Sequence, residues 1–222
     1  MKQTTLKRTR RTVCTVLAAA ALVTGLSACA PLIVGGAVVG GVMAVDRRTT
    51  GTQIEDEGIE LRAANRIRET LGDRAHVNVT SYNRQALLTG EVPSAQDRQT
   101  VEQIVSQVEN TRSVVNDLAV MPASSLSQRS NDTFITGKVR ASLVDAQDIS
   151  ANSFKVVTER NIVYLMGRVS QREANRATEI ARGVSGVSKV VRVFEIVSEE
   201  ELRRIAPQPA PVTTDNSASP GG

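Results

Sequence analysis

The sequence predicts an α+β protein in which two tandem copies of a small unit each fold as helix, strand, strand, helix, strand (αββαβ). Each copy is expected to pack two helices on a three-stranded mixed sheet. An internal repeat, the periodicity of apolar residues in each copy and an aliphatic composition predict this fold. Of the 222 residues, 41% are hydrophobic but only 2% are aromatic, so Val, Ile, Leu and Ala must build the cores.

The repeat pairs apolar positions of the first copy with apolar positions of the second at a nearly constant offset. The offset changes by a single position, and only in segments that read as loops, where insertions are tolerated. The paired positions are Ile59, Ala63 and Ile67 with Ile135, Val139 and Leu143; Val77, Val79, Leu88, Gly90 and Val92 with Phe154, Val156, Leu165, Gly167 and Val169; Val101, Ile104, Val105 and Val108 with Ala177, Ile180, Ala181 and Val184; and Val114, Val115, Leu118 and Val120 with Val190, Val191, Phe194 and Ile196.

The elements of the first copy follow from these positions. Apolar residues at every fourth position predict an amphipathic first helix. Two alternating strands, 77–81 and 86–92, are expected on either side of a polar turn that contains Asn83. After a second helix, a last strand over about 113–120 closes the unit, and the strand–helix–strand connection should be right-handed.

The second helix of each copy begins with a capping pattern. Ser94 is followed at the third position by Asp97, and Ser170 by Glu173, which is typical of an N-cap with an acidic partner. The predicted organisation is a signal peptide at 1–28, a lipidated apolar and Gly-rich tether at 29–52, a first domain at 53–121, a Ser-rich linker at 122–130, a second domain at 131–198, and a short extension with a disordered tail at 199–222.

Residues 1–28 have the pattern of an export signal: a basic start, an apolar run from about Val13 to Leu26, and small residues at the end. Leu26-Ser27-Ala28-Cys29 is similar to the bacterial lipobox, and this resemblance implies that Cys29 is acylated and becomes the N-terminus. An ordinary signal peptide with a chance Cys is the alternative. The Arg10-Arg11 pair is also found in signals for twin-arginine export, but ordinary secretion is favoured. Because Ala30 is not Asp, the analogy with lipoproteins implies the outer membrane.

The basic charge of the chain belongs to this leader. Five of the 27 Lys and Arg lie in residues 1–28, which hold no Asp or Glu, so the rest has 22 basic against 23 acidic side chains. A nucleic-acid partner is therefore not expected. Residues 31–45 are apolar and glycine-rich but too short to span a bilayer comfortably. A flexible segment at the membrane surface is favoured over helix association through Gly36 and Gly40.

The repeat resembles the BON domain of bacterial envelope proteins. The pattern Val163-x-Leu165-x-Gly167-x-Val169, a helix, and then residues 183–190 (GVSGVSKV) carry the resemblance, while the first copy is more divergent. With the lipobox, residues 26–197 resemble dual BON-domain lipoproteins of the outer membrane. The resemblance implies roles in outer-membrane integrity, binding of anionic phospholipids and the cell-division site.

No catalytic, cofactor or metal site is expected. His76 is the only histidine. It lies between a predicted loop and strand and has no second His or free Cys to complete a metal site, so a solvated loop residue is favoured. No Ser-centred nucleophile elbow is present. Gly90 and Gly167 lie inside strand patterns, where close approach of a helix or a bulge is the usual reason for glycine.

A comparison of the two copies suggests where lipid would bind. The first helix of copy one carries Glu55, Asp56, Glu57 and Glu60, which would repel anionic lipid, and Phe134 in copy two replaces Gly58. An apolar ring flanked by cations enters the headgroup region. The expected lipid-contact residues are Thr133, Phe134, Lys138, Arg140 and Ala141. The alternative is that Phe134 packs against the other domain.

Two functions remain open. The first is a non-enzymatic, lipid-anchored protein, facing the periplasm, that binds anionic phospholipid of the phosphatidylglycerol or cardiolipin class and supports outer-membrane integrity and division-linked maintenance. The second is an adaptor for envelope or division proteins, such as assembly machinery or cell-wall hydrolase regulators, which would dock by adding a strand to a sheet edge.

Overall fold

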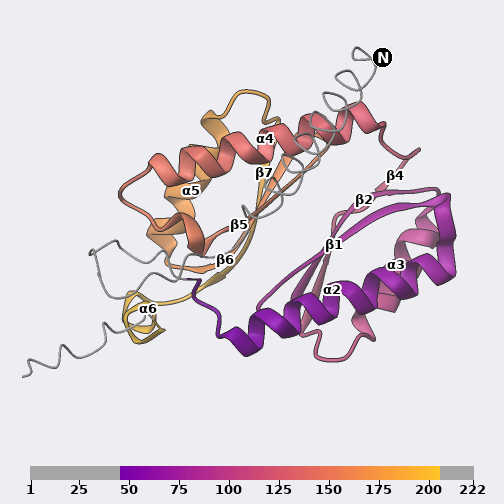
Figure 1. Ribbon diagram of the computed structural model, residues 1–222, viewed down its shortest axis with the longest axis horizontal. Helices are drawn as coiled ribbons and strands as arrows, with labels where there is room; N and C mark the ends of the chain where they lie inside the picture. Colours follow the sequence, from indigo (N-terminus) through magenta and orange to yellow (C-terminus); the bar gives the residue numbers. More distant parts are fainter. Residues whose placement is uncertain (1–45, 206–222) are drawn as a thin grey trace, which may run out of the picture. The chain divides into compact units, whose positions relative to one another are not determined.

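The computed structural model describes residues 46–205. Each copy of the repeat forms one mixed sheet with two long helices (Figure 1). The first copy contains α2 (Thr50–Leu71), a 3-10 turn (Gly72–Arg74), β1 (His76–Tyr82), β2 (Gln85–Val92), α3 (Ala95–Ser106), β3 (Ser113–Asn116) and β4 (Ala119–Val120). The second contains α4 (Leu126–Asp145), a 3-10 turn (Ala151–Ser153), β5 (Lys155–Glu159), β6 (Ile162–Val169), α5 (Gln171–Gly183) and β7 (Lys189–Ile196), and α6 (Glu199–Ile205) follows.

The sheet topology confirms the predicted fold class. In the first copy β1 is antiparallel to β2, and β3 and β4 are both parallel to β2. In the second copy β5 is antiparallel to β6, and β7 is parallel to β6. The last strand of the first copy, predicted over 113–120, is divided into β3 and β4, which both pair with β2 in the same register.

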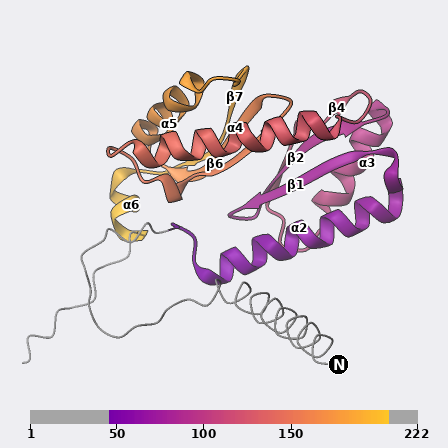
Figure 2. The same cartoon turned by 45° about the horizontal axis from the view of Figure 1, so that its top comes forward.

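A separate aliphatic core lies between the helices and the sheet of each copy. The first is centred on Ile59, Ala63, Leu88, Val101 and Val105. The second uses the equivalent positions of the repeat: Ile135, Val139, Leu165, Ala177 and Ala181. In Figure 2 the two helices of each copy lie on the same side of their sheet. Most positions that the repeat pairs therefore pack between helix and sheet. The exceptions lie in the last strand: Val115 and Val191 pack on the opposite sheet faces, and Val120 and Ile196 are exposed.

A third core covers the other faces of the two sheets. Tyr82 and Leu87 of the first copy pack with Tyr164, Met166 and Val193 of the second. The Tyr164 hydroxyl donates a 2.7 Å hydrogen bond to Asp117. The sequence predicted helices on one face of each sheet and gave no expectation for this contact. Because both faces are covered, Leu87, Thr89 and Glu91 of β2 are all buried.

Each hairpin turn is held by a buried aspartate. Asn83 and Arg84 both have positive φ, as a two-residue type I′ turn requires, and their backbone N–H groups donate to Asp56 at 2.8 and 2.7 Å. The turn at Arg160 and Asn161 repeats this arrangement with Asp132, the equivalent of Asp56 in the second copy. Asp56 also accepts hydrogen bonds from Ser81 and Arg48.

Gly90 and Gly167 lie where another backbone segment comes very close. A Cβ atom on Gly90 would lie 2.1 Å from the carbonyl oxygen of His76, and one on Gly167 would lie 2.3 Å from that of Ser153. Gly90 also has φ +112°, a conformation that other residues rarely adopt. The approaching group is a backbone carbonyl in both copies and not a helix.

One element differs from the predicted organisation. Helix α4 begins at Leu126, inside the expected linker, because Ser125 and Gln128 form a capping box. Helix α6 occupies the start of the expected short extension. The predicted signal peptide, Cys29, the tether up to residue 45 and the tail from residue 206 lie outside the described residues.

Candidate functional site: the outer face of helix α4

Helix α4 carries apolar side chains on the face that points away from its own core. Its buried face consists of Asp132, Ile135, Val139 and Leu143. On the opposite face, 66% of Phe134 is exposed, and Ala141 is exposed as well. Phe134 belongs to none of the three cores that buried residues form within 46–205.

The ends of the same face also carry apolar residues. Leu126 is 80% exposed and Val144 is 68% exposed. They are separated by about five helical turns, so they project in the same direction. Neither residue was expected at this site from the sequence. Leu126 falls in the predicted linker. Val144 follows the core position Leu143, and the repeat identifies only positions on the buried face of the helix.

Cationic side chains flank this apolar face. The Lys138 ammonium lies 5.0 Å from the centroid of the Phe134 ring and donates a hydrogen bond to the carbonyl of Ser185. On the other side, the Arg140 guanidinium donates to the carbonyl of Val156 at 3.4 Å. The Thr133 hydroxyl donates a hydrogen bond to the backbone carbonyl of Arg129 in the same helix, and Thr133 is exposed.

Grooves run along both sides of α4. The groove between α4 and α5, of about 600 Å³, is lined by the apolar residues Ala141, Ile180 and Val184 and by three charged ones. These are Lys138, Glu179 and Arg176, and Arg176 also forms an ion pair with Asp148. The groove on the other side, of about 400 Å³, is lined by Arg140 and Val144 together with residues from the 3-10 turn and β5. Four of the five predicted lipid-contact residues thus lie on the exposed face or in these grooves, and Thr133 lies next to Phe134.

The corresponding helix of the first copy differs from the sequence expectation. Asp56 was expected on an acidic surface, but it is buried and lies 2.7 Å from Arg48. Burial alone would raise the pKa of Asp56, but its hydrogen bonds with Ser81, Arg84, Arg48 and Asn83 outweigh burial, and the pKa lies below its ordinary value. Glu55 forms an ion pair with Arg62, and Glu60 forms one with Lys155.

Apolar side chains are exposed on α2 as well, although it has no aromatic residue. Ile54 is 65% and Leu61 is 64% exposed. At the position equivalent to Phe134, Gly58 leaves room that the Arg62 guanidinium occupies. The two copies therefore differ most clearly in Phe134 and in the groove between α4 and α5.

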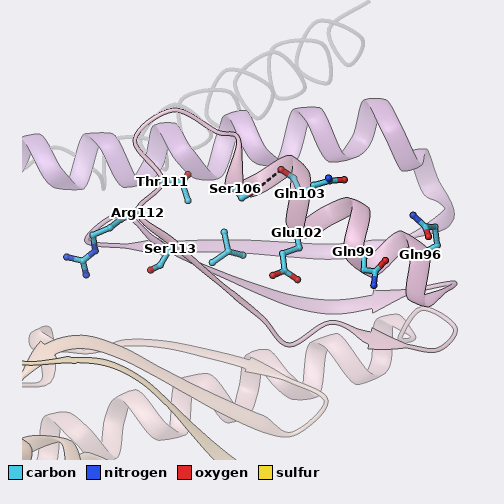
Figure 3. A pocket seen from close by; sticks show the side chains of 9 residues that line it. Gln96, Gln99, Glu102, Gln103, Ser106, Thr111, Arg112 and Ser113 are labelled. Carbon is cyan, nitrogen blue, oxygen red and sulfur yellow. Dashed lines mark hydrogen bonds between the residues drawn. The ribbon is translucent and has the colours of Figure 1, made fainter.

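A polar groove lies in the first copy between α3 and the edge strand β3 (Figure 3). It measures about 560 Å³ and is lined mainly by amide and hydroxyl groups, including Gln96, Gln99 and Gln103 of α3. Arg112, the cation among these lining residues, lies 3.0 Å from Glu195. No sequence pattern pointed to this groove.

His76 is not the solvated loop residue that the sequence favoured. It is the first residue of β1, its side chain is 17% exposed, and its Nδ1 lies 3.0 Å from a carboxylate oxygen of Glu91.

Within residues 46–205, no helix is both long and apolar enough to cross a membrane.

Comparison with known proteins agrees with this architecture. The BON domain family matches residues 56–122 and 131–198. Outer membrane lipoprotein DolP of Haemophilus influenzae is 37% identical over 172 residues, which cover 77% of this chain and 89% of the relative. The 21 kDa hemolysin of Actinobacillus pleuropneumoniae is 32% identical over 155 residues, 69% of this chain and 80% of that protein.

A solved structure of CdsD, a structural protein of the type III secretion system of Chlamydia trachomatis, aligns with 71% of this chain and 99% of its own, at 13% identity and a TM-score of 0.27. The family match covers more than half of the chain, and the similarity to DolP extends over most of it. The chain therefore belongs to the BON-domain family and carries two copies of the domain.

Proposed function

We propose that this chain is an outer-membrane lipoprotein, facing the periplasm, that binds anionic phospholipid through α4 and performs no chemistry of its own. Lipidation of Cys29 and a link to cell division are part of the proposal. The observation that carries it is the exposed ring of Phe134, which has Lys138 beside it on the outer face of α4. The DolP relative, named an outer membrane lipoprotein, supports the location and a role in envelope integrity.

The expected binding mode follows from the two kinds of side chain on α4. Phe134, Leu126 and Val144 would enter the boundary between headgroups and acyl chains, as amphipathic helices do. The cations would remain at the level of the lipid phosphates, where each Lys or Arg contributes about 1 kcal/mol. Lys138 lies beside the Phe134 ring, so the aromatic and cationic groups would reach the surface together.

Replacement of Phe134 by Glu tests the proposal. Burying a Phe side chain contributes about 1.5–3 kcal/mol, so Phe134→Glu should weaken binding to phosphatidylglycerol vesicles by about tenfold or more. The measurement is flotation of a chain that lacks residues 1–45, so that no lipid anchor contributes. Phosphatidylcholine vesicles, which carry no net charge, should bind weakly in every case.

Leu61→Glu is the matched control. It introduces the same charge at an apolar side chain of almost equal exposure, 64% against 66%, but on α2 of the first copy. Circular dichroism should show both variants folded, because neither side chain is buried. The proposal fails if Phe134→Glu floats as well as the unmodified chain, or if Leu61→Glu causes an equal loss.

A second candidate function is that of an adaptor for envelope proteins. The groove between α3 and β3 favours it, because β3 lies at the edge of its sheet and an extended peptide can add a strand there. Lining amides such as Gln99 and Gln103 would bond to such a peptide. In a pull-down from envelope extract, Phe134→Glu should then retain its protein partner while it loses vesicle binding.

A further inference from the structure

Three side chains with metal-binding atoms meet on the sheet faces that point away from the helices. His76 and Glu91 are directly paired across the antiparallel strands β1 and β2, so their side chains lie side by side on one face. Glu159 reaches them from the end of β5 in the second copy. The imidazole nitrogen and the carboxylate oxygens of the three residues all lie within 4.8 Å of one another.

The distances fit a small divalent ion. Zn–N and Zn–O bonds of about 2.0–2.2 Å place neighbouring tetrahedral ligand atoms about 3.3 Å apart. His76 Nδ1 lies 3.0 Å from Glu91 Oε2 and 3.9 Å from Glu159 Oε1, so the two observed separations bracket that value. One imidazole and two carboxylates, with water in the fourth position, form a ligand set that Zn²⁺ accepts.

The cluster holds two buried carboxylates beside a single imidazole. Glu91 and Glu159 are buried, and Arg160, 3.2 Å from Glu91, balances one of them. Glu159 accepts a hydrogen bond from Asn78 through Oε2, but no residue in 46–205 donates one to Oε1. A divalent cation would offset the negative charge of the second carboxylate.

The second copy shows that the fold does not require these residues. At the strand offset that pairs Val77 with Phe154, the equivalents of His76 and Glu91 are Ser153 and Arg168, and the equivalent of Glu159 is Tyr82. None of the three equivalents offers an imidazole or a carboxylate. Each copy pairs its first two strands in the same antiparallel way in its own sheet. The strand pairing therefore does not require two buried carboxylates beside an imidazole.

The surrounding groups would hold the ligands in position. Glu91 accepts hydrogen bonds from the backbone N–H of Ser124 and from Arg160, and Asn78 holds the far oxygen of Glu159. Such hydrogen bonds orient ligating carboxylates in metal sites. A groove of about 360 Å³, lined by His76, Glu159 and Thr133 among others, opens to the cluster and would admit a hydrated ion.

We propose that His76, Glu91 and Glu159 bind one divalent transition-metal ion of the Zn²⁺ class. Because Glu159 belongs to the second copy and the other two ligands to the first, the ion fastens the two domains to each other. Oxygen-preferring Ca²⁺ and Mg²⁺ are poorer candidates, because an imidazole suits Zn²⁺ and its neighbours. Thr133 lines the groove beside this site and is also an expected lipid-contact residue, but none of the three metal ligands belongs to the lipid-binding face, so the proposal does not depend on the proposed function.

The test uses the full chain in detergent, with its thiols alkylated, after dialysis against EDTA. Zn²⁺ is titrated at pH 7 in competition with a chromophoric chelator. We expect the unmodified chain to bind one equivalent of Zn²⁺. His76→Gln and Glu159→Gln should bind Zn²⁺ at least tenfold more weakly. Zn²⁺ should raise the Tm by about 5 °C or more in the unmodified chain only.

Glu60→Gln is the control. It breaks the contact between the copies at Lys155 but leaves the three ligands, so it should bind Zn²⁺ as the unmodified chain does. If His76→Gln and Glu159→Gln do not fold, the test is made with Co²⁺ bound to the unmodified chain instead. Visible absorption typical of tetrahedral Co²⁺ that disappears when Zn²⁺ is added would support the site. A zinc stoichiometry that His76→Gln leaves unchanged would overturn the proposal, and so would the absence of the Co²⁺ absorption. His76 would then be only a hydrogen-bond partner of Glu91.

Discussion

Asp56 and Asp132 hold the two hairpin turns in the same way, although the sequence suggested a surface charge for the first. Each accepts both backbone N–H groups of a turn whose residues have positive φ. The carboxylate thereby satisfies donors that the turn leaves without strand partners. Asp56 has an additional cation in Arg48, which also stacks on the Tyr82 ring at 4.4 Å.

Replacement of these aspartates should therefore destabilise the chain to different degrees. Asp56→Asn removes a buried charge that is paired with Arg48, and we expect it to lower the free energy of unfolding by about 3 kcal/mol. Arg48 keeps Asp46 as an ion-pair partner, so the loss in Asp56→Asn comes from the buried Asp56 carboxylate itself. Among residues 46–205 Asp132 has no ion pair, so the expected loss for Asp132→Asn is about 1–2 kcal/mol. Urea unfolding at pH 7 measures both, and equal losses would contradict this difference between the two carboxylates.

The pH dependence has a definite sign. The pKa of Asp56 is lower in the folded chain than in the unfolded chain, where it lies at about 3.9. Its contribution to stability is therefore complete above about pH 4–5 and is lost as the pH falls through the folded value. In Asp56→Asn this part of the acid unfolding should disappear, so the difference between the two proteins should shrink with acidification.

At the scale of the element, α4 combines a core stripe with an exposed apolar face. Its capping box at Ser125 and Gln128 extends the helix to Leu126, so the exposed face covers about five turns rather than the shorter helix expected from the repeat. The same Ser–x–x–Glu/Gln signature is recognisable in the sequence at Ser170. At Ser125 it is hidden, because the residues that follow, 127–130, are polar and look like a linker.

This longer face predicts graded effects along the helix. Leu126→Glu and Val144→Glu should each weaken binding to phosphatidylglycerol vesicles by about threefold to tenfold, less than Phe134→Glu, because an aliphatic side chain at the end of the helix buries less area. Lys138→Gln should instead reduce the dependence of binding on salt concentration. Flotation at two ionic strengths measures these effects, and loss of binding that is equal for all four variants would contradict an oriented helix.

The sequence predicted the features that local periodicity determines. Core positions such as Ile59 and Ile135, the capping residues Ser94 and Ser170, and the mixed sheet follow from spacing within one copy and from its repetition. The metal-ligand cluster did not follow, because Glu159 and His76 lie in different copies and meet only when the two copies pack. The sequence pointed to Phe134 as a surface residue only because its equivalent in the first copy is Gly58, which has no side chain to pack.

At the scale of the whole described chain, the two sheets share a core that includes Tyr82, Leu87 and Tyr164. One signal for it was present in the sequence: Ala86, Leu87 and Leu88 are consecutive apolar residues, which is typical of a strand covered on both faces. The ion pairs between Glu60 and Lys155 and between Arg112 and Glu195 also join the copies. Because each copy uses its outer sheet face for this contact, the helices are left to meet other partners.

The most direct test of the lipid-binding account maps the contact over both copies at once. A chain lacking residues 1–45 is placed with phosphatidylglycerol bicelles that contain a lipid with a nitroxide on its headgroup, and the attenuation of each backbone amide NMR signal is measured. The account predicts the strongest attenuation along α4, from Leu126 to Val144, and in the adjoining part of α5, with α2 much less affected. Attenuation on α2 equal to that on α4, or none on α4, would contradict it.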